Sequence, residues 1–437
     1  MSDARILVAV ASAGALASCF SPSYGPGGFL CSNGECPEGY ACVVEGSMKV
    51  CRRGASSGDL AADRARVDGI SQVDGIPRVD RLLDKPKGEA GPAGCGFTEV
   101  IPGTGAVPKL ALSFDLATDG SSQPHVVYVD PVASGILQQT VRLGGKWVTT
   151  QVKTTVSSPS SQVAIAVDPA DRLHVVRRGM EGGNQRLFHV WRNLSTPPST
   201  WQVDTRVSPS LDVSALDVAA APSGVYLVAS GKDGMSGSLS AWVASLSGAS
   251  YAYKPLESHP ELSDARVGAG ANLWSFSGYG AGAVQWQMRS GPSGLATSSQ
   301  QTQNNIVNGQ PMPAPVAVDA SGGRHYAYVR SQSGPANLSY LSWAAGSSIV
   351  AESNPGSSAA APASLDIALD STGKPCISFS ESGQVRVLCS TGGTWKQKTS
   401  VPASAAFTRL AVAKNGWLYV VYLASGPNEL RASCILP

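Results

Sequence analysis

The chain has 437 residues, of which 15% are charged, and its 33 basic and 31 acidic residues leave a formal charge of +2. This near balance lacks the basic surface that nucleic-acid-binding proteins use, so we expect no nucleic acid partner. Glycine (48 residues) and proline (29 residues) are abundant, which favours short strands joined by turns over long helices.

Residues 1–18 predict an export signal. After Arg5, the run from Ile6 to Ala17 is almost entirely small or apolar, which fits a signal-peptide core and is too short to span a bilayer. The run ends in Leu16-Ala17-Ser18-Cys19, which resembles the lipobox of bacterial lipoproteins. The resemblance implies cleavage before Cys19 and a diacylglycerol on its thiol. We therefore expect an exported protein held by a lipid anchor at the bacterial outer membrane or cell surface; the alternative is an ordinary secretory signal.

The cysteine count agrees with this compartment. Nine cysteines are present, and setting Cys19 aside for the lipid leaves eight, enough for four disulfides in an oxidising environment. Four of them fall within residues 19–52, a segment too small to bury a core of its own, namely Cys31, Cys36, Cys42 and Cys51. We expect two disulfides here, in one of three connectivities. A zinc site is not favoured, because the segment has no CxxC pair and no histidine.

Residues 53–94 read as a flexible linker. The run repeats Val-Asp-Gly-Ile and ends in Lys-Pro-Lys-Gly-Glu-Ala-Gly-Pro. It holds too few large apolar groups to offset the entropy of ordering. The predicted domains are therefore 1–18, 19–52, 53–94 and 95–437.

Residues 95–437 contain a repeat: a short apolar strand, a polar turn, and a second strand rich in Val and Tyr. Successive copies are about 50 residues apart and centre on Asp119, Asp168, Ala220, Gly268, Asp319, Asp370 and Ala413. A period of this length with several strands per unit is typical of a β-propeller blade. A later strand that begins near a tryptophan gives four strands per unit. The predicted fold is thus all-β, a seven-bladed propeller; six blades is the alternative because the copy at Gly268 is poor.

The last repeat contains only three strands, so we expect Cys95–Val100 to supply its fourth strand. That pairing joins the two ends of the domain and removes an open sheet edge. It also brings Cys95 beside Cys434, where a disulfide would close a loop of more than 300 residues and stabilise the fold by about 4 to 5 kcal/mol.

A tight hairpin is predicted around Ser382-Gly383. With these two residues as the turn, Cys376 and Cys389 lie directly opposite each other at a non-hydrogen-bonded pair. The strands approach most closely at such pairs, which favours a cross-strand disulfide.

The repeat also contains polar positions near its turns. His125, His174 and His325 occupy equivalent positions on different units, so we interpret them as structural and predict no metal site. Asp119, Asp168, Asp319 and Asp370 precede tight turns, where an Asp side chain binds local backbone N–H groups. We expect carboxylates on separate blades to stay apart, so that no acid–base pair forms.

The domain resembles the broad class of BNR-like and sialidase-like propellers. The nearest match to the Asp-box of that class is Ser390–Trp395, which lacks its aspartate and one residue of spacing, so no catalytic residue is assigned. No HExxH or P-loop motif occurs either, and residues 95–437 contain no GxSxG sequence, so we predict no cofactor. Trp147, Trp201 and Trp395, at equivalent repeat positions, are candidates for stacking on a sugar ring; packing between blades is the alternative.

We therefore expect a cell-envelope lipoprotein whose propeller acts as a binding or scaffold module for a glycan or an envelope protein. A divergent glycoside hydrolase or lyase is the alternative function. A spacer without a ligand is the third.

Overall fold

A computed structural model divides the chain into two compact units, Met1–Lys85 and Pro86–Pro437. It describes residues 29–30, 40–45, 48–53, 95–104, 113–130, 136–152, 162–181, 184–197, 200–203, 211–233, 239–247, 250–256, 264–270, 274–280, 283–285, 314–330, 336–345, 350–358, 362, 364–402, 405–424 and 429–436. Every regular element in these segments is a β-strand, which confirms the all-β prediction. No helix long and apolar enough to cross a membrane occurs in this part of the chain.

The first unit contains a small antiparallel sheet. Its strands are β1 (Phe29–Leu30), β2 (Tyr40–Glu45) and β3 (Met48–Arg53), in the order β1-β3-β2. The register pairs Cys42 with Cys51. Cys19, Cys31 and Cys36 lie outside the described residues, as does nearly all of the predicted linker, so the lipid site and the disulfides of this unit stay predictions.

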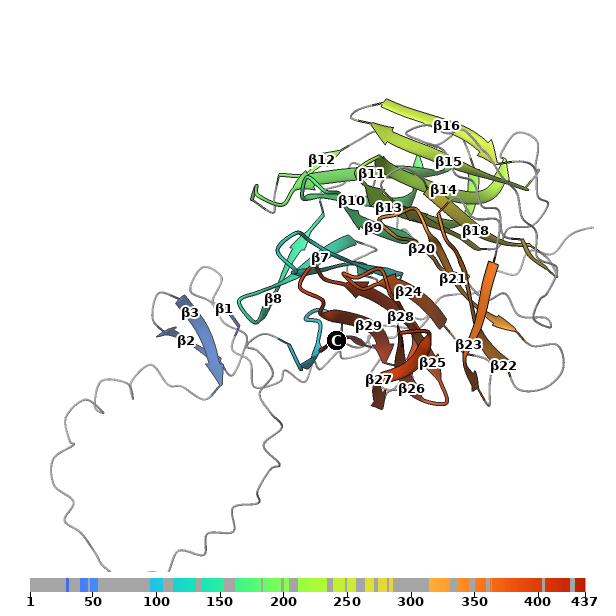
Figure 1. Ribbon diagram of the computed structural model, residues 1–437. Helices are drawn as coiled ribbons and strands as arrows, with labels where there is room; N and C mark the ends of the chain where they lie inside the picture. Colours follow the sequence, from blue (N-terminus) through green and yellow to red (C-terminus); the bar gives the residue numbers. More distant parts are fainter. Residues whose placement is uncertain are drawn as a thin grey trace, which may run out of the picture. The chain divides into compact units, whose positions relative to one another are not determined.

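The described strands of the second unit form seven antiparallel sheets, numbered 1 to 7 in chain order (Figure 1). Sheets 1 and 2 contain β5 (Phe114–Thr118), β6 (Pro124–Asp130), β7 (Ile136–Leu143) and β8 (Lys146–Gln151), then β9 (Val163–Val167), β10 (Arg172–Glu181), β11 (Asn184–Asn193) and β12 (Gln202–Val203). Sheets 3 and 4 contain β13 (Leu211–Ala221), β14 (Gly224–Asp233), β15 (Leu239–Ser247) and β16 (Ser250–Leu256), then β17 (Asp264–Ala269), β18 (Trp274–Gly280) and β19 (Ala283–Gln285). Sheets 5 and 6 contain β20 (Val316–Val318), β21 (Arg324–Arg330), β22 (Ala336–Trp343) and β23 (Val350–Ser358), then β24 (Ser364–Leu369), β25 (Pro375–Glu381), β26 (Gln384–Thr391) and β27 (Thr394–Pro402). Sheet 7 contains β28 (Ala405–Val412), β29 (Leu418–Ala424), β30 (Glu429–Ile435) and β4 (Thr98–Val100).

The sheets pack on one another in chain order. The first strand of each sheet contacts the first strand of the next, and β28 of sheet 7 contacts β5 of sheet 1. Clusters of buried hydrophobic side chains join sheets 1 to 2, 2 to 3, 3 to 4, 5 to 6 and 6 to 7, and a further cluster joins sheet 7 to sheet 1. Between sheets 4 and 5, the Ser277 hydroxyl donates to the Ala314 carbonyl and the hydroxyls of Ser275 and Tyr326 are hydrogen-bonded.

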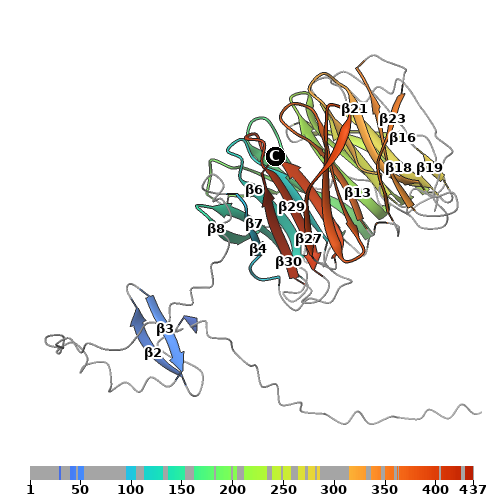
Figure 2. The same cartoon turned by 60° about the horizontal axis from the view of Figure 1, so that its bottom comes forward.

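The two ends of this unit meet in sheet 7, as predicted. Strand β4 pairs with β30, so that Thr98 lies opposite Ser433 and Val100 opposite Arg431 (Figure 2). The Gly96 amide donates to the Cys434 carbonyl, and the Cys434 amide donates to the Phe97 carbonyl. A disulfide joins Cys95 to Cys434, which are 339 residues apart in the sequence.

The predicted hairpin in sheet 6 is confirmed. Glu381 pairs with Gln384 and Cys376 with Cys389, and these two cysteines form a disulfide. Ser382 and Gly383 both have positive φ angles, of 48° and 75°. A two-residue turn with positive φ at both positions matches the right-handed twist of the flanking strands.

Candidate functional site

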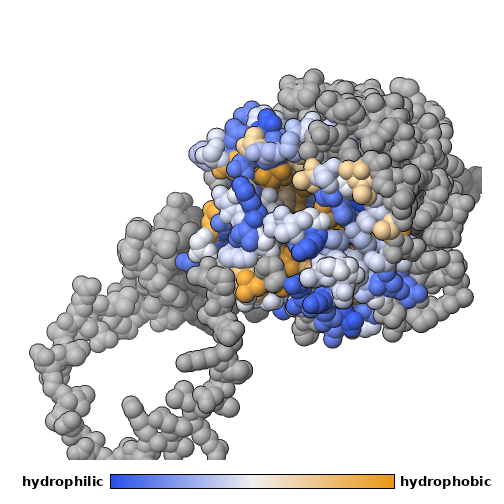
Figure 3. Space-filling model, viewed as in Figure 1, coloured by the Kyte–Doolittle hydropathy of each residue, from blue (hydrophilic) through white to orange (hydrophobic). Residues whose placement is uncertain are grey.

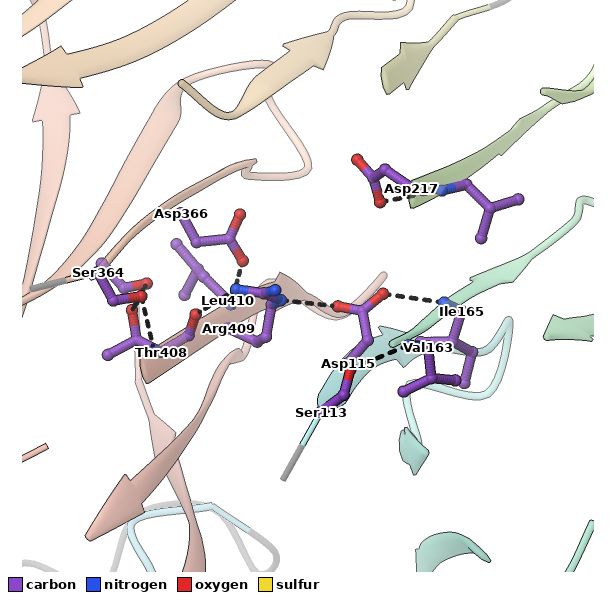
Figure 4. A network of polar contacts seen from close by, with 12 residues as sticks. Ser113, Asp115, Val163, Ile165, Asp217, Ser364, Asp366, Thr408, Arg409 and Leu410 are labelled. Atoms are coloured by element: carbon purple, nitrogen blue, oxygen red, sulfur yellow. Dashed lines mark hydrogen bonds and ion pairs between the residues drawn. The ribbon is translucent and has the colours of Figure 1, made fainter. Parts of the chain in front are cut away.

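One position of the repeat brings charged side chains to the axis around which the sheets are arranged. It lies on the first strand of each sheet, or directly before it in sheet 5, and is four residues before the residue that precedes the turn (Asp119 in sheet 1). Its occupants, in order, are Asp115, Ala164, Asp217, Arg266, Pro315, Asp366 and Arg409. Figure 4 shows three of the carboxylates and one guanidinium from four different sheets facing a common space.

The three carboxylates link neighbouring sheets. Asp115 accepts the backbone N–H of Ile165 at 2.9 Å. In the same way, Asp217 accepts the N–H of Val267 at 2.9 Å and Asp366 accepts that of Leu410 at 2.8 Å (Figure 4). Adjacent first strands belong to different sheets and share no ladder of hydrogen bonds, so these side chains supply acceptors that the backbone needs.

The three axial carboxylates differ in their charged neighbours. The Arg409 Nε donates to Asp115 at 3.1 Å. Burial raises the pKa of Asp217 to about 7; the Arg266 guanidinium opposes this shift and the Asp115 carboxylate adds to it. Burial also raises the pKa of Asp366, against the guanidiniums of Arg409 and Arg266. Our expectation that carboxylates on separate sheets stay apart is therefore wrong at this position, because first strands converge on the axis.

The raised pKa of Asp217 predicts a specific pH dependence of stability. The folded protein keeps a proton on Asp217 at pH values where the unfolded chain has lost it, so this group's contribution is full below about pH 4 and is lost as the pH rises through about 7. Asp217→Asn keeps an acceptor for Val267 and cannot ionise. Because Asp217 is still partly exposed, solvent screening makes the effect on stability smaller than the full pKa shift implies. We expect the free energy of unfolding of the variant, relative to that of wild type, to rise by about 1 to 2 kcal/mol from pH 4 to pH 8. Urea unfolding of both proteins at the two pH values measures this; an unchanged difference contradicts it.

The turn aspartates act as predicted. Asp119 Oδ1 accepts the amides of Ser121 and Gln123, and equivalent pairs of bonds form at the other three turns. Each equivalent histidine bridges its turn aspartate to a residue on the third strand. His125, for example, lies 3.0 Å from Asp119 and 3.1 Å from Gln139. His174 and His325 make the same bridges, from Asp168 to His189 and from Asp319 to Tyr340. The structural interpretation of these groups is confirmed.

The three candidate tryptophans all pack against hydrophobic clusters. Trp147 donates its indole N–H to Glu99 at 2.8 Å, and Trp395 donates to Ser353 at 3.1 Å. Trp201 is 6% exposed and lies under the Arg192 guanidinium. A ligand-binding role for them stays a prediction, since these contacts show only their packing.

One hollow lies between sheets 7 and 1, and we call it the 7–1 pocket. Its volume is about 510 Å³. The lining residues are Ser121, Ser122, Gln123, Pro124, Arg142, Gly144, Gly145, Asn415, Trp417 and Tyr419. Turns build most of it: the turn between β5 and β6, the turn between β28 and β29, and the Gly144-Gly145 turn, where both residues have positive φ.

Its side chains are held in place from behind. The Arg142 guanidinium donates to both carboxylate oxygens of Glu99, at 3.0 and 2.9 Å, and lies 3.7 Å above the Phe97 ring. The Tyr419 hydroxyl donates to the Ser122 carbonyl at 3.2 Å. The pocket therefore combines a fixed arginine and aromatic rings with neutral hydrogen-bonding groups.

A second hollow, the 2–3 pocket, lies between sheets 2 and 3 and has a volume of about 320 Å³. It contains the same pair of residue types, since the Arg172 guanidinium lies 5.9 Å from the Trp191 ring. Arg172 donates to Asp168 at 2.6 Å. Burial, together with the neighbouring His189, lowers the pKa of His174 in its wall to about 4, so this imidazole is neutral at pH 7.

Our sequence analysis did not single out the pocket residues or the axial charges. The axial set was detectable in principle, because a charged residue of this set lies two to four positions before the repeat centre in five of the seven copies. The pockets carried no comparable signal: Arg142 and Trp417 are 275 residues apart, and only the packing of sheet 7 on sheet 1 brings them together.

Comparisons with known proteins leave the function open. No protein-family model and no curated protein matches the sequence. Among solved structures, a protein of unknown function from Dyadobacter fermentans matches with 10% identity and a TM-score of 0.45, covering 78% of this chain and 97% of that one. An α-L-arabinanase from Penicillium chrysogenum, complexed with arabinobiose, matches with 11% identity and a TM-score of 0.47, covering 77% and 97%. The Aleuria aurantia lectin, complexed with Fucα1-6GlcNAc, matches with 12% identity and a TM-score of 0.39, covering 75% and 96%. At these values, none of the likenesses defines what this chain binds.

Proposed function

We propose that residues 95–437 form a seven-bladed β-propeller that binds carbohydrate in the 7–1 pocket. The blade count is supported by the packing of each described sheet on the next and of sheet 7 on sheet 1. The binding function rests on one observation, the composition and volume of the pocket.

The pocket suits a sugar better than an apolar ligand. A sugar ring has apolar C–H faces and a rim of hydroxyls, so it needs an aromatic surface beside hydrogen-bonding groups. Trp417 and Tyr419 supply the aromatic surface; Gln123, Asn415 and Arg142 supply hydrogen-bonding groups. The volume lies within the range of about 300–1,000 Å³ typical of small-molecule sites. Hydrophobic areas on the described surface seen in Figure 3 are small and separated by hydrophilic residues, which favours a polar ligand over a broad apolar partner surface.

Replacing Trp417 tests this proposal. We expect the full chain to be retained on at least one member of a glycan array, and Trp417→Ala to lower that retention at least tenfold, since an aromatic platform is lost. Phe407, an aromatic residue of the same sheet that is 46% exposed and outside the pocket, provides the control. Phe407→Ala should bind like wild type. Equal losses in both variants, or no retained glycan, would count against the proposal.

The glycoside hydrolase or lyase alternative rests on a different observation. The axis places Asp217, whose pKa burial raises to about 7, near the ion-paired Asp115, and general acid–base catalysis uses a group whose pKa lies near the working pH. Their hydrogen bonds to the backbone of neighbouring sheets favour a structural role instead. Assaying retained glycans for new reducing ends or unsaturated products separates the two roles.

We also propose that Cys19 carries a lipid that displays the propeller outside the cell. The support is the Leu16–Cys19 motif after an apolar run, and the even count of eight cysteines that remains. Fatty-acid labelling that persists in Cys19→Ser would contradict it.

A further inference from the structure

The 7–1 and 2–3 pockets lie close to each other on the same face of the propeller. Each is built around turns that join the first strand of a sheet to the second. The turn of sheet 1 lines the 7–1 pocket through Ser121, and the turn of sheet 2 lines the 2–3 pocket through Ala170. These two neighbouring turns therefore lie between the two pockets.

The two turns are in direct contact. The Gly120 amide donates to Asp171 Oδ1 at 2.8 Å. A Cβ atom on Gly120 would lie 2.7 Å from that oxygen, so a larger residue here would displace the Asp171 carboxylate. Both residues are exposed, and their neighbours Ser121 and Ala170 are small and exposed too. The divide between the pockets is thus a low ridge without a large side chain.

Both pockets share one pair of residue types. Each contains one arginine and one tryptophan, namely Arg142 with Trp417 and Arg172 with Trp191. Two similar sites in a row suit a ligand that repeats along its own length, as a polysaccharide does.

The charges indicate which polysaccharides fit. Arg142 is paired with both oxygens of Glu99, and Arg172 is paired with Asp168. Each guanidinium is already neutralised by a carboxylate of the protein, and the ridge between them carries the Asp171 side chain. A chain of uronic acids would meet no uncompensated positive charge among these residues, whereas a neutral chain has no charge to compensate.

We propose that the two pockets are subsites of one binding track for a linear, uncharged polysaccharide that crosses the ridge formed by Gly120 and Asp171. This inference rests on the proposed carbohydrate-binding function and adds the length and charge of the ligand. A lectin that recognises a single terminal sugar would use each pocket independently, and its affinity would not depend on chain length.

Titration calorimetry of the full chain with xylo-oligosaccharides and α-1,5-arabino-oligosaccharides of two and six units tests the track. For at least one series we expect the six-unit ligand to bind at least tenfold more tightly than the two-unit ligand. Trp191→Ala should abolish that gain and leave two-unit binding within twofold of wild type, which also shows that the variant is folded. Ala170→Trp provides a second variant if Trp191→Ala does not fold. It places a large side chain in the 2–3 pocket from an exposed position and should likewise abolish the gain for six units.

The outcomes separate this inference from the proposed function. Two-unit binding that requires Trp417, with equal affinity for six units or no effect of either 2–3 pocket variant, overturns the track and retains the carbohydrate site. Binding of hexagalacturonate tenfold tighter than either neutral hexamer overturns the preference for neutral chains. Binding of neither neutral series overturns the track and leaves the glycan array to decide the carbohydrate site. Binding unaffected by Trp417→Ala overturns both.

Discussion

Replacing Cys95 and Cys434 with serine should lower the free energy of unfolding by about 5 kcal/mol, because the chain-entropy model assigns about 6 kcal/mol to a loop of this length and measured disulfide contributions reach about 5 kcal/mol. The disulfide closes a loop with a sequence separation of 339 residues, so its removal restores much conformational entropy to the unfolded chain. It also frees β4, which pairs with β30 over only three residues, Thr98, Glu99 and Val100. Urea unfolding of the full chain measures the first effect. Hydrogen exchange at the amides of Gly96 and Cys434, both hydrogen-bonded at this junction, reports the second.

The second disulfide of the domain provides a matched control. Cys376 and Cys389 are only 13 residues apart, so the same model assigns their bond about 3 kcal/mol. Serine at both positions should therefore cost less than serine at Cys95 and Cys434, and should leave exchange in β4 unchanged. Equal losses from the two pairs would show that loop length does not determine the stabilisation.

Asp115→Ala should destabilise the fold by about 3 kcal/mol, because it leaves two partners unsatisfied. The Arg409 guanidinium, 18% exposed, loses its ion pair, and the Ile165 amide loses its acceptor. Asp115→Asn retains an acceptor for Ile165 and removes only the charge, so we expect it to cost less. Both values come from urea unfolding at pH 7.

Glu429→Ala serves as the control for Asp115→Ala. Glu429 and Arg431 form an ion pair within β30 of sheet 7, but the Arg431 side chain is 36% exposed. Exposed pairs contribute about 0 to 1 kcal/mol. A loss from Asp115→Ala no greater than from Glu429→Ala would show that the axial network does not stabilise the fold. A double-mutant cycle with Arg409→Ala isolates the energy of the ion pair itself.

Local and periodic features of this protein were readable from its sequence. Short apolar runs and a spacing of about 50 predicted strands such as Val163–Val167 and their turns, because these depend on neighbouring residues. The hairpin at Ser382-Gly383 followed from turn geometry. The pairing of Cys95–Val100 with the last repeat followed from the need to complete its sheet, and thereby also placed Cys95 beside Cys434.

Only the tertiary structure brought together the two features on which the functional proposals depend. Asp115, Asp217 and Asp366 meet because first strands surround a common axis, and the length of the repeat does not say which of its side chains point there. Arg142 and Trp417 meet because sheet 7 packs on sheet 1. Such contacts join residues far apart in the sequence, and they are determined by the packing of whole sheets, whereas strands, turns and the repeat are determined by short-range preferences that every copy expresses by itself.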